Sequence, residues 1–358
     1  MQRIQILIDK AKNGLIFVLV IAPLIACAQE PTEPSGNRNP ARNPPNARTG
    51  GRQQGSQAQQ GNPEQRGNQQ GRQGGGQRGT GGSGLGAYEK PPSPANDVPS
   101  RPFDLVLGRP TDRSITVRVM PFGDGQGRVR YREVQGGGGA SDLSESKTTS
   151  WKTFRNDVPF SIELEGLKPD TRYMYTWEYQ PTGAEKSIET PIYTFHTQRS
   201  PGSSYVFTVT SDSHLDENSS GEVYLRTLAN VLADQSDFHL ELGDTFMTGK
   251  YKQPQFSYGH YLSQRYYLGS ACHSVPFYLV LGNHDGESPS RGDTLWATKT
   301  RKALFPNPEP NGFYSGNSDK LAEIGTIDDY YAWHWGDALF IALDPYRYTL
   351  ERPRRGEN

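Results

Sequence analysis

Three short polar motifs carry the side chains most able to do chemistry. They occupy residues 212–214 (Asp-Ser-His), 243–244 (Gly-Asp) and 282–285 (Gly-Asn-His-Asp). Two carboxylates, an imidazole and an amide oxygen form a mixed oxygen and nitrogen ligand set, which suits Mn, Fe or Zn better than a thiolate-seeking metal. A carboxylate can bridge two metal ions about 3.5–4 Å apart, and such a pair can activate a water while clamping phosphoryl oxygens. The motifs therefore predict a site for one or two metal cations with oxygen and nitrogen ligands.

Each motif follows an apolar run with the pattern of a buried strand. The runs are Tyr205–Val209, Phe238–Leu242 and Val275–Leu281. Two segments with helical character, Val223–Leu232 and Tyr261–Leu268, separate them. Alternating strands and helices predict a parallel sheet with helices on its faces, and open α/β sheets bind ligands at the carboxyl ends of their strands. The three motifs are therefore expected to meet at one edge of the sheet.

The preceding part of the chain, Arg101–Gln198, alternates apolar and polar residues as half-buried strands do. Short runs of this kind recur between Gly, Pro and Asp turns, at residues 115–119, 129–131, 160–164, 173–177 and 192–195. Such spacing suggests a β-sandwich. The stretch Leu167–Tyr175 resembles the corner of a fibronectin type III-like domain, in which a tyrosine bonds back to the backbone. We expect this domain to act as a spacer or as a wall on the substrate side.

The N-terminus has the pattern of a secretory signal. Three basic residues within Met1–Asn13 precede an apolar run, Gly14–Ala26, which is too short for a spanning helix. The sequence Leu-Ile-Ala-Cys ending at Cys27 resembles the bacterial lipobox, whose cysteine is lipidated, and two or more acyl chains anchor a protein stably. We therefore expect an anchored lipoprotein of the bacterial cell envelope, with the membrane as a partner. An ordinary signal peptide with a chance cysteine is the alternative.

Composition separates the folded parts from a tether. Residues 29–84 contain no Val, Ile, Leu, Met, Phe, Tyr or Trp, so this segment cannot bury enough apolar surface to fold. The whole chain of 358 residues has 38 Lys and Arg against 39 Asp and Glu, which argues against a nucleic-acid partner. Two cysteines exclude a disulfide scaffold. The predicted order is signal peptide 1–27, Gly/Gln/Asn/Pro/Arg-rich tether 28–100, sandwich 101–199 and α/β domain 200–358.

The three motifs, in this order and each after a strand, resemble those of the calcineurin-like metallophosphoesterases. With a fibronectin-like domain in front, the chain is most similar to the purple acid phosphatase and alkaline phosphatase D branch. The resemblance implies two divalent or trivalent metal ions (Mn, Fe or Zn), a phosphate-ester substrate and attack by a metal-bound hydroxide. It implies that Asp212 and His214 hold the first metal, that Asp244 bridges both, and that Asn283 holds the second.

The last motif also supplies the residues implied to act in catalysis. His284 matches the histidine that stabilises the leaving oxygen or donates its proton, and Asp285 is expected to orient that imidazole. Gly243 and Gly282 are expected to let the backbone turn tightly under the metals.

The sequence departs from the family pattern in two ways. Met247 occupies the position of the tyrosine that binds ferric iron in purple acid phosphatases, so a purple centre is not expected. The family also uses a later histidine and a Gly-His-x-His motif, whereas only His334, in a predicted strand, follows His284 here. We therefore expect residues 200–358 to be the first two-thirds of the domain, and this chain to be a fragment with little activity. The alternative is a surface lipoprotein whose degenerate phosphatase-like domain is a binding module; oligomeric state and the choice between monoester and diester stay open.

Overall fold

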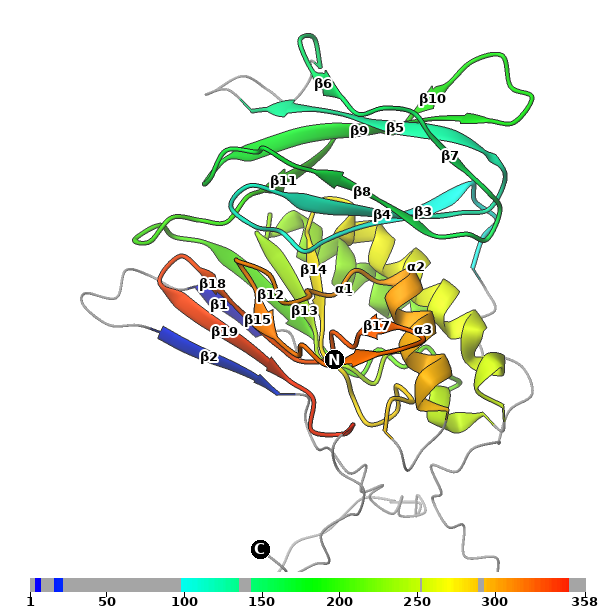
Figure 1. The fold of residues 1–358 in the computed structure, drawn as a ribbon, viewed down its shortest axis with the longest axis vertical. Helices are drawn as coiled ribbons and strands as arrows, with labels where there is room; N and C mark the ends of the chain where they lie inside the picture. The colour runs from blue at the N-terminus through cyan, green and yellow to red at the C-terminus, as the bar shows by residue number, and fades with distance from the viewer. Residues whose placement is uncertain are drawn as a thin grey trace, which may run out of the picture. The chain divides into compact units, whose positions relative to one another are not determined.

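The described part of the chain forms a β-sandwich followed by an α/β domain (Figure 1). The computed structural model describes residues 98–134, 143–251, 253–288 and 293–347, and the backbone of two N-terminal strands, β1 (Ile4–Leu7) and β2 (Ile16–Ile21). These residues belong to one compact unit, made of residues 1–24 and 83–358. The predicted lipidation site Cys27 and the predicted tether up to residue 97 lie outside the described residues. Within the described ranges, no helix has the length and apolar character needed to cross a membrane.

Two antiparallel sheets make up the sandwich, and they share one apolar core. One sheet contains β3 (Phe103–Gly108), β4 (Ile115–Pro121) and β8 (Phe160–Leu164). The other contains β5 (Gly125–Glu133), β6 (Lys147–Thr148), β7 (Lys152–Phe154), β9 (Arg172–Pro181), β10 (Ile188–Glu189) and β11 (Tyr193–His196). Buried and partly exposed residues alternate along β5, which is the period of two that the sequence predicted.

The predicted tyrosine corner is present. The hydroxyl of Tyr173 accepts a 2.8 Å hydrogen bond from the backbone N–H of Lys168, so the loop before β9 is fixed to that strand. Trp177, in the same strand, is fully buried. Its ring requires Gly127 on the neighbouring strand β5, because a Cβ at that glycine would lie 2.0 Å from the indole. The β-sandwich prediction is therefore confirmed.

A parallel three-stranded sheet forms the centre of the α/β domain. Its strands are β12 (Val206–Thr210), β13 (Phe238–Glu241) and β14 (Phe277–Leu279), and they pair in this order. The helices are α1 (Gly221–Ala233), α2 (Tyr258–Cys272) and α3 (Thr294–Leu304), with the short 3-10 helices η1 (Thr248–Lys250) and η2 (Pro254–Ser257). Ser220 caps α1 by accepting the backbone N–H of Val223. The predicted strand–helix–strand–helix–strand order is confirmed.

Different layers cover the two faces of this central sheet. Side chains of Phe277, Leu279 and Leu281 pack with the helices in one buried apolar cluster. Tyr278 and Phe340 belong to a second cluster, formed with a further sheet on the opposite face (Figure 1). That sheet contains β15 (Ser315–Gly316), β18 (Tyr331–Trp335), β19 (Ala338–Leu343) and β2, and a separate small hairpin is formed by β16 (Lys320–Leu321) and β17 (Gly325–Thr326).

The N-terminal strands occupy the outer edges of these two sheets. β1 pairs antiparallel with β12, and β2 pairs parallel with β19. A turn at Gly336–Asp337 joins β18 to β19, because Trp335 pairs with Ala338 across it. His334 is an exposed strand residue, as expected.

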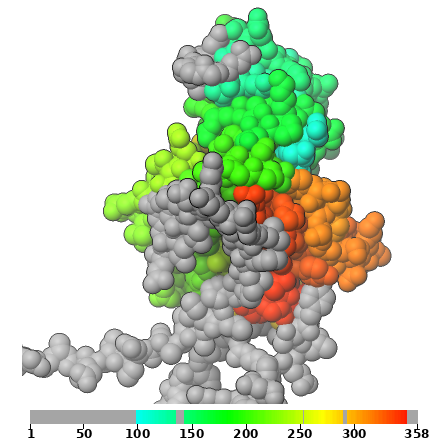
Figure 2. All heavy atoms as spheres, turned by 90° about the vertical axis from the view of Figure 1, so that its left-hand side faces the viewer, coloured from blue at the N-terminus to red at the C-terminus, as the bar shows by residue number. Residues whose placement is uncertain are grey.

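The sandwich packs directly on the α/β domain. β14 pairs with β3 at Phe277 and Gly108, so the strand order across the junction is β1-β12-β13-β14-β3-β4-β8. Val106 of β3 and Met120 of β4 are fully buried in the same apolar cluster as α2. On another side, Gln198 donates to the backbone carbonyl of His334 at 2.9 Å, and Figure 2 shows the red residues of β18 and β19 against the green end of the sandwich. The sandwich is therefore part of the wall of the α/β domain rather than a detached spacer.

A buried guanidinium fixes this junction. Arg265 of α2 is fully buried, and it donates to the carbonyls of Asp104 (2.8 Å), Arg118 (2.9 Å) and Leu304 (3.0 Å). The first two carbonyls belong to the sandwich and the third to the end of α3. Burial, the largest effect, lowers the pKa of Arg265 to about 9. One side chain thus connects three elements of two domains.

Candidate metal centre

The three polar motifs meet at the carboxyl ends of β12, β13 and β14. Asp212 donates its backbone N–H to the carbonyl of Gly243 at 3.0 Å, and His214 donates its own to the carbonyl of Asp244 at 3.2 Å. The backbone N–H of His284 donates to Oδ1 of Asp244 at 2.9 Å. Hydrogen bonds therefore join the three loops at the edge where the sequence predicted a site.

Asp212, His214 and Asp244 form a cluster that can hold a metal ion. The Nε2 atom of His214 lies 3.8 Å from Oδ1 of Asp212 and 3.9 Å from Oδ2 of Asp244, and one ligand atom from each residue lies within 4.8 Å of the others. Donor atoms at Zn–N and Zn–O lengths of about 2.0–2.2 Å would be roughly 3.4 Å apart in a tetrahedral site. The cluster needs only a small contraction to reach that spacing.

The chemistry of the donor set also fits a cation. The buried Nε2 of His214 has no hydrogen-bond partner among the described residues, although it faces two carboxylates. Burial opposes a charged imidazole, but the carboxylates of Asp212 and Asp216 outweigh that effect and raise the pKa of His214 to about 10. The same negative charge that favours a proton on His214 would attract a metal cation, which would replace that proton on binding.

Two glycines allow the loops to approach one another. A Cβ on Gly243, whose φ is +91°, would lie 2.2 Å from the backbone nitrogen of Gly282. A Cβ on Gly282 would lie 2.3 Å from Oδ1 of Asp244. Asp212 and Asp244 themselves have φ values of +57° and +53°, a left-handed backbone that costs non-glycine residues on the order of 1–3 kcal/mol. The expectation of tight turns beneath the ligands is confirmed.

The Asp285 carboxylate is bound by backbone N–H groups on both sides of the site. Its carboxylate accepts four backbone N–H groups: those of Asp244 (3.0 Å), Thr245 (2.7 Å), Phe246 (2.8 Å) and Gly282 (2.8 Å). Four donors fill the acceptor sites of a carboxylate. Asp285 therefore holds the loop that carries Asp244, and its expected role in orienting the His284 imidazole stays a prediction. Burial, followed by the charge of Asp244, raises the pKa of Asp285 to about 7.

The remaining predicted residues lie in the same turn. The ring centroids of His284 and His214 are 6.0 Å apart, so His284 is beside the cluster without belonging to it. Asn283 is half-buried between Gly282 and His284. Its assignment to a second metal stays a prediction, as does the catalytic role of His284.

Comparison with known proteins assigns the domain. A family model described as calcineurin-like phosphoesterase matches residues 205–350. This segment is a calcineurin-like phosphoesterase domain. The resemblance stated from the motifs is therefore confirmed, and with the observed sandwich the predicted two-part fold class is confirmed as well. No curated protein matches the chain.

The chain is also similar to several solved structures. Purple acid phosphatase PPD1 from yellow lupin (Lupinus luteus) seeds is 16% identical with a TM-score of 0.48, and the match covers 69% of this chain and 46% of that one. PhoD is 15% identical with a TM-score of 0.46, covering 70% and 54%. The chain thus spans about half the length of these structures. The fibronectin type III domain of human fibronectin type III domain containing protein 3 is 16% identical with a TM-score of 0.20, covering 28% and 85%.

Several residues that support the phosphoesterase site were not singled out from the sequence. Gln264 of α2 is fully buried and donates to Oγ of Ser213 at 2.8 Å and to the carbonyl of Thr245 at 2.9 Å. It therefore connects the first metal-ligand loop to the second. Asp216 and Lys250 form an ion pair behind His214. Gln264 and Lys250 belong to no recognisable motif, so their positions in the sequence did not indicate a role at this site.

A second buried polar group lies within the central sheet. The imidazole of His239 bonds to the hydroxyls of Thr208 and Thr210, both at 2.9 Å, and Thr210 also donates to Glu241. Burial lowers the pKa of His239 to about 4 and raises that of Glu241 to about 8. His239 is therefore a packed neutral histidine, as predicted.

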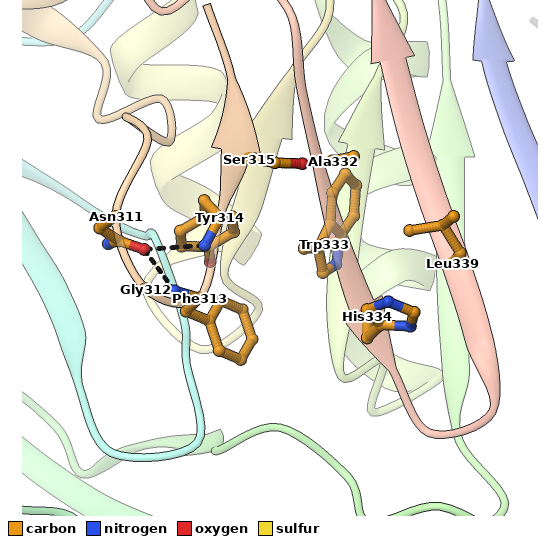
Figure 3. Close-up of a pocket in the computed structure, with 9 residues that line it drawn as sticks. All are labelled: Asn311, Gly312, Phe313, Tyr314, Ser315, Ala332, Trp333, His334 and Leu339. Atoms are coloured by element: carbon orange, nitrogen blue, oxygen red, sulfur yellow. Dashed lines mark hydrogen bonds between the residues drawn. The ribbon is translucent and has the colours of Figure 1, made fainter. Parts of the chain in front are cut away.

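Two further histidines outside the motifs, His260 and His273, are also packed residues. His260 is fully buried in α2, and His273 stacks on Tyr193 with ring centroids 4.1 Å apart. His334 lines a pocket of about 260 Å³ together with Tyr314 and Trp333 (Figure 3). None of the predicted metal ligands or catalytic residues lines this pocket. Met247, at the position of the purple-centre tyrosine, is buried.

Proposed function

We propose that this protein is a metal-dependent phosphoester hydrolase. The observation that carries the proposal is the cluster of Asp212, His214 and Asp244 at the carboxyl ends of adjacent parallel strands. Its place within a calcineurin-like phosphoesterase domain supports a phosphate ester as the substrate class. Bound ions in such a centre polarise phosphoryl oxygens and generate the attacking nucleophile.

We further propose that the centre is dinuclear and that Asp244 bridges the two ions. The two oxygens of its carboxylate face different neighbours: Oδ2 faces the His214 imidazole, and Oδ1 accepts the backbone N–H of His284. Asn283, which precedes that N–H, would supply the amide oxygen of the second position. Asp285 accepts the backbone N–H of Asp244, which fixes the position of the carboxylate that would bridge the two ions.

His284 is the candidate for proton transfer to the leaving oxygen. Its ring is half-exposed beside the cluster, 6.0 Å from His214, where an ester oxygen on a bound phosphoryl group could reach it. An imidazole can act as a general acid that donates a proton to a departing alkoxide.

We also propose that the protein is a lipoprotein of the bacterial cell envelope, anchored through Cys27. The basic N-terminal residues, the short apolar run and the lipobox-like sequence support this cellular location. Metabolic labelling with a fatty acid should mark the wild-type protein and leave Cys27→Ala unlabelled.

Hydrolysis of an aryl phosphate tests the catalytic proposal. The chain, supplied with Mn²⁺ or Zn²⁺, should release the phenol at a low but measurable rate, and Asp244→Asn should reduce that rate by roughly 100-fold because the shared ligand is lost. Asp319→Asn, at an exposed carboxylate of the same domain, should retain the wild-type rate. Equal rates in Asp244→Asn and the wild type would overturn the assignment.

A further inference from the structure

The His214 imidazole lies between carboxylates on both of its edges. Its Nε2 faces the two proposed metal ligands, whereas its Nδ1 lies 3.6 Å from Oδ2 of Asp216. Asp216 is almost completely buried, with 1% of its surface exposed. Because the two ring nitrogens point in different directions, Asp216 cannot share an ion held at Nε2.

Asp216 is itself held by several donors. Its Oδ1 accepts the backbone N–H of Asn218 at 3.0 Å and the hydroxyl of Ser219 at 3.3 Å. Its Oδ2 accepts from the ammonium of Lys250, which also lies 3.7 Å from Glu217. The carboxylate therefore has a fixed position, and its charge is balanced by a cation from the loop that follows Asp244.

The backbone around His214 needs such support. His214 and Leu215 have φ values of +50° and +55°, so two consecutive non-glycine residues are left-handed. This conformation persists only where surrounding contacts enforce it. Leu215 is fully buried, and the ion pair with Lys250 holds the next residue, Asp216.

We propose that Asp216, held in place by Lys250, is the positioning residue for the His214 metal ligand. A carboxylate beside Nδ1 keeps the ring hydrogen on that nitrogen and leaves the Nε2 lone pair directed toward Asp212 and Asp244. Lys250 keeps the carboxylate in this place and couples the first ligand loop to the second. This inference rests on the proposed metal-dependent function.

Metal affinity tests the proposal without reference to catalysis. Competition with a chromophoric chelator should show that Asp216→Asn binds Zn²⁺ or Co²⁺ about 10–100-fold more weakly than the wild type, the range found for such outer partners. Lys250→Gln should weaken binding in the same direction and keeps the proposal testable if Asp216→Asn does not fold. Lys299→Gln, which breaks an exposed ion pair with Glu323, is the matched control and should bind as the wild type does.

A spectroscopic measurement separates positioning from general destabilisation. In the Co²⁺-loaded wild type, the Nδ1 hydrogen of His214 should give a hyperfine-shifted, exchange-protected proton signal that His214→Asn removes. Asp216→Asn should shift or lose this signal while the circular dichroism of the protein stays unchanged. An unchanged signal and unchanged affinity in both Asp216→Asn and Lys250→Gln, with Asp244→Asn still abolishing binding, would overturn the inference and leave the proposed function intact. Absence of metal binding by the wild type would instead overturn the proposed function, and this inference with it.

Discussion

Asp285→Asn should destabilise the domain strongly although the substitution hardly changes the size of the side chain. The carboxylate accepts two buried N–H groups on each oxygen: Thr245 and Phe246 on Oδ1, Asp244 and Gly282 on Oδ2. An asparagine has one acceptor oxygen, so either orientation of the amide leaves two of the donors facing an NH₂ group.

The size of the effect follows from those two lost acceptors. A buried donor left without a partner costs about 1–3 kcal/mol, so Asp285→Asn should lose roughly 2–6 kcal/mol of unfolding free energy. This is a large share of the roughly 5–15 kcal/mol that stabilises an ordinary domain. The loss should also release the loop that carries Asp244, so metal affinity should fall together with stability.

Urea unfolding of the metal-free chain measures this effect. Unfolding should be measured at pH 8, where the wild-type group is ionised, and at pH 6, because the pKa of Asp285 is raised to about 7 and the wild type, unlike Asp285→Asn, therefore loses stability as the pH rises toward that value. Tryptophan fluorescence reports both domains, because Trp177 is buried in the sandwich and Trp333 and Trp335 are buried in the α/β domain. Asp319→Asn removes an exposed carboxylate and should unfold with the wild-type midpoint. A loss below about 0.5 kcal/mol in Asp285→Asn would refute the role assigned to the four N–H bonds.

Two further changes test the junction and the buried sheet. Arg265→Met removes the donors of three buried carbonyls. At about 1 kcal/mol for each lost hydrogen bond, it should lower the free energy of unfolding by about 3 kcal/mol. Calorimetry should then resolve separate unfolding transitions of the sandwich and the α/β domain, and a single wild-type-like transition would contradict the argument. Burial raises the pKa of Glu241 from 4.5 to about 8, so the folded state binds the proton more tightly than the unfolded state, and stability falls as pH rises from about 4.5 to 8. Glu241→Gln should remove a decline of about 3 kcal/mol between pH 6 and pH 9, measured by urea unfolding of the metal-free protein; an identical decline in the variant would exclude Glu241 as its source.

The position of the metal cluster could be predicted because it depends on topology. Parallel strands bring their carboxyl ends to one edge, so Asp212, Asp244 and His284 had to approach one another once the strand–helix alternation was recognised. The sandwich and its corner followed in the same way from alternation and from the residues around Tyr173. These features are repeated or local, and a single sequence displays them.

The supporting interactions could not be predicted because they join distant segments through single side chains. Gln264 and Arg265 are neighbours in one helix, yet one connects the two ligand loops and the other fixes the sandwich to the α/β domain. Nothing in the sequence indicated that four backbone N–H groups surround the carboxylate of Asp285. Asp216, which does face an imidazole, lies in a loop without a recognisable motif.

Crystallography with anomalous scattering locates the metal most directly. Crystals of the full chain grown with Zn²⁺ should give an anomalous peak at the zinc edge bounded by Asp212, His214 and Asp244, at the roughly 2.0–2.2 Å distances typical of zinc ligands. A second peak between Asp244 and Asn283 would establish the dinuclear centre. A protein that hydrolyses phosphate esters while its zinc lies elsewhere, with these three side chains free of metal, would contradict the account.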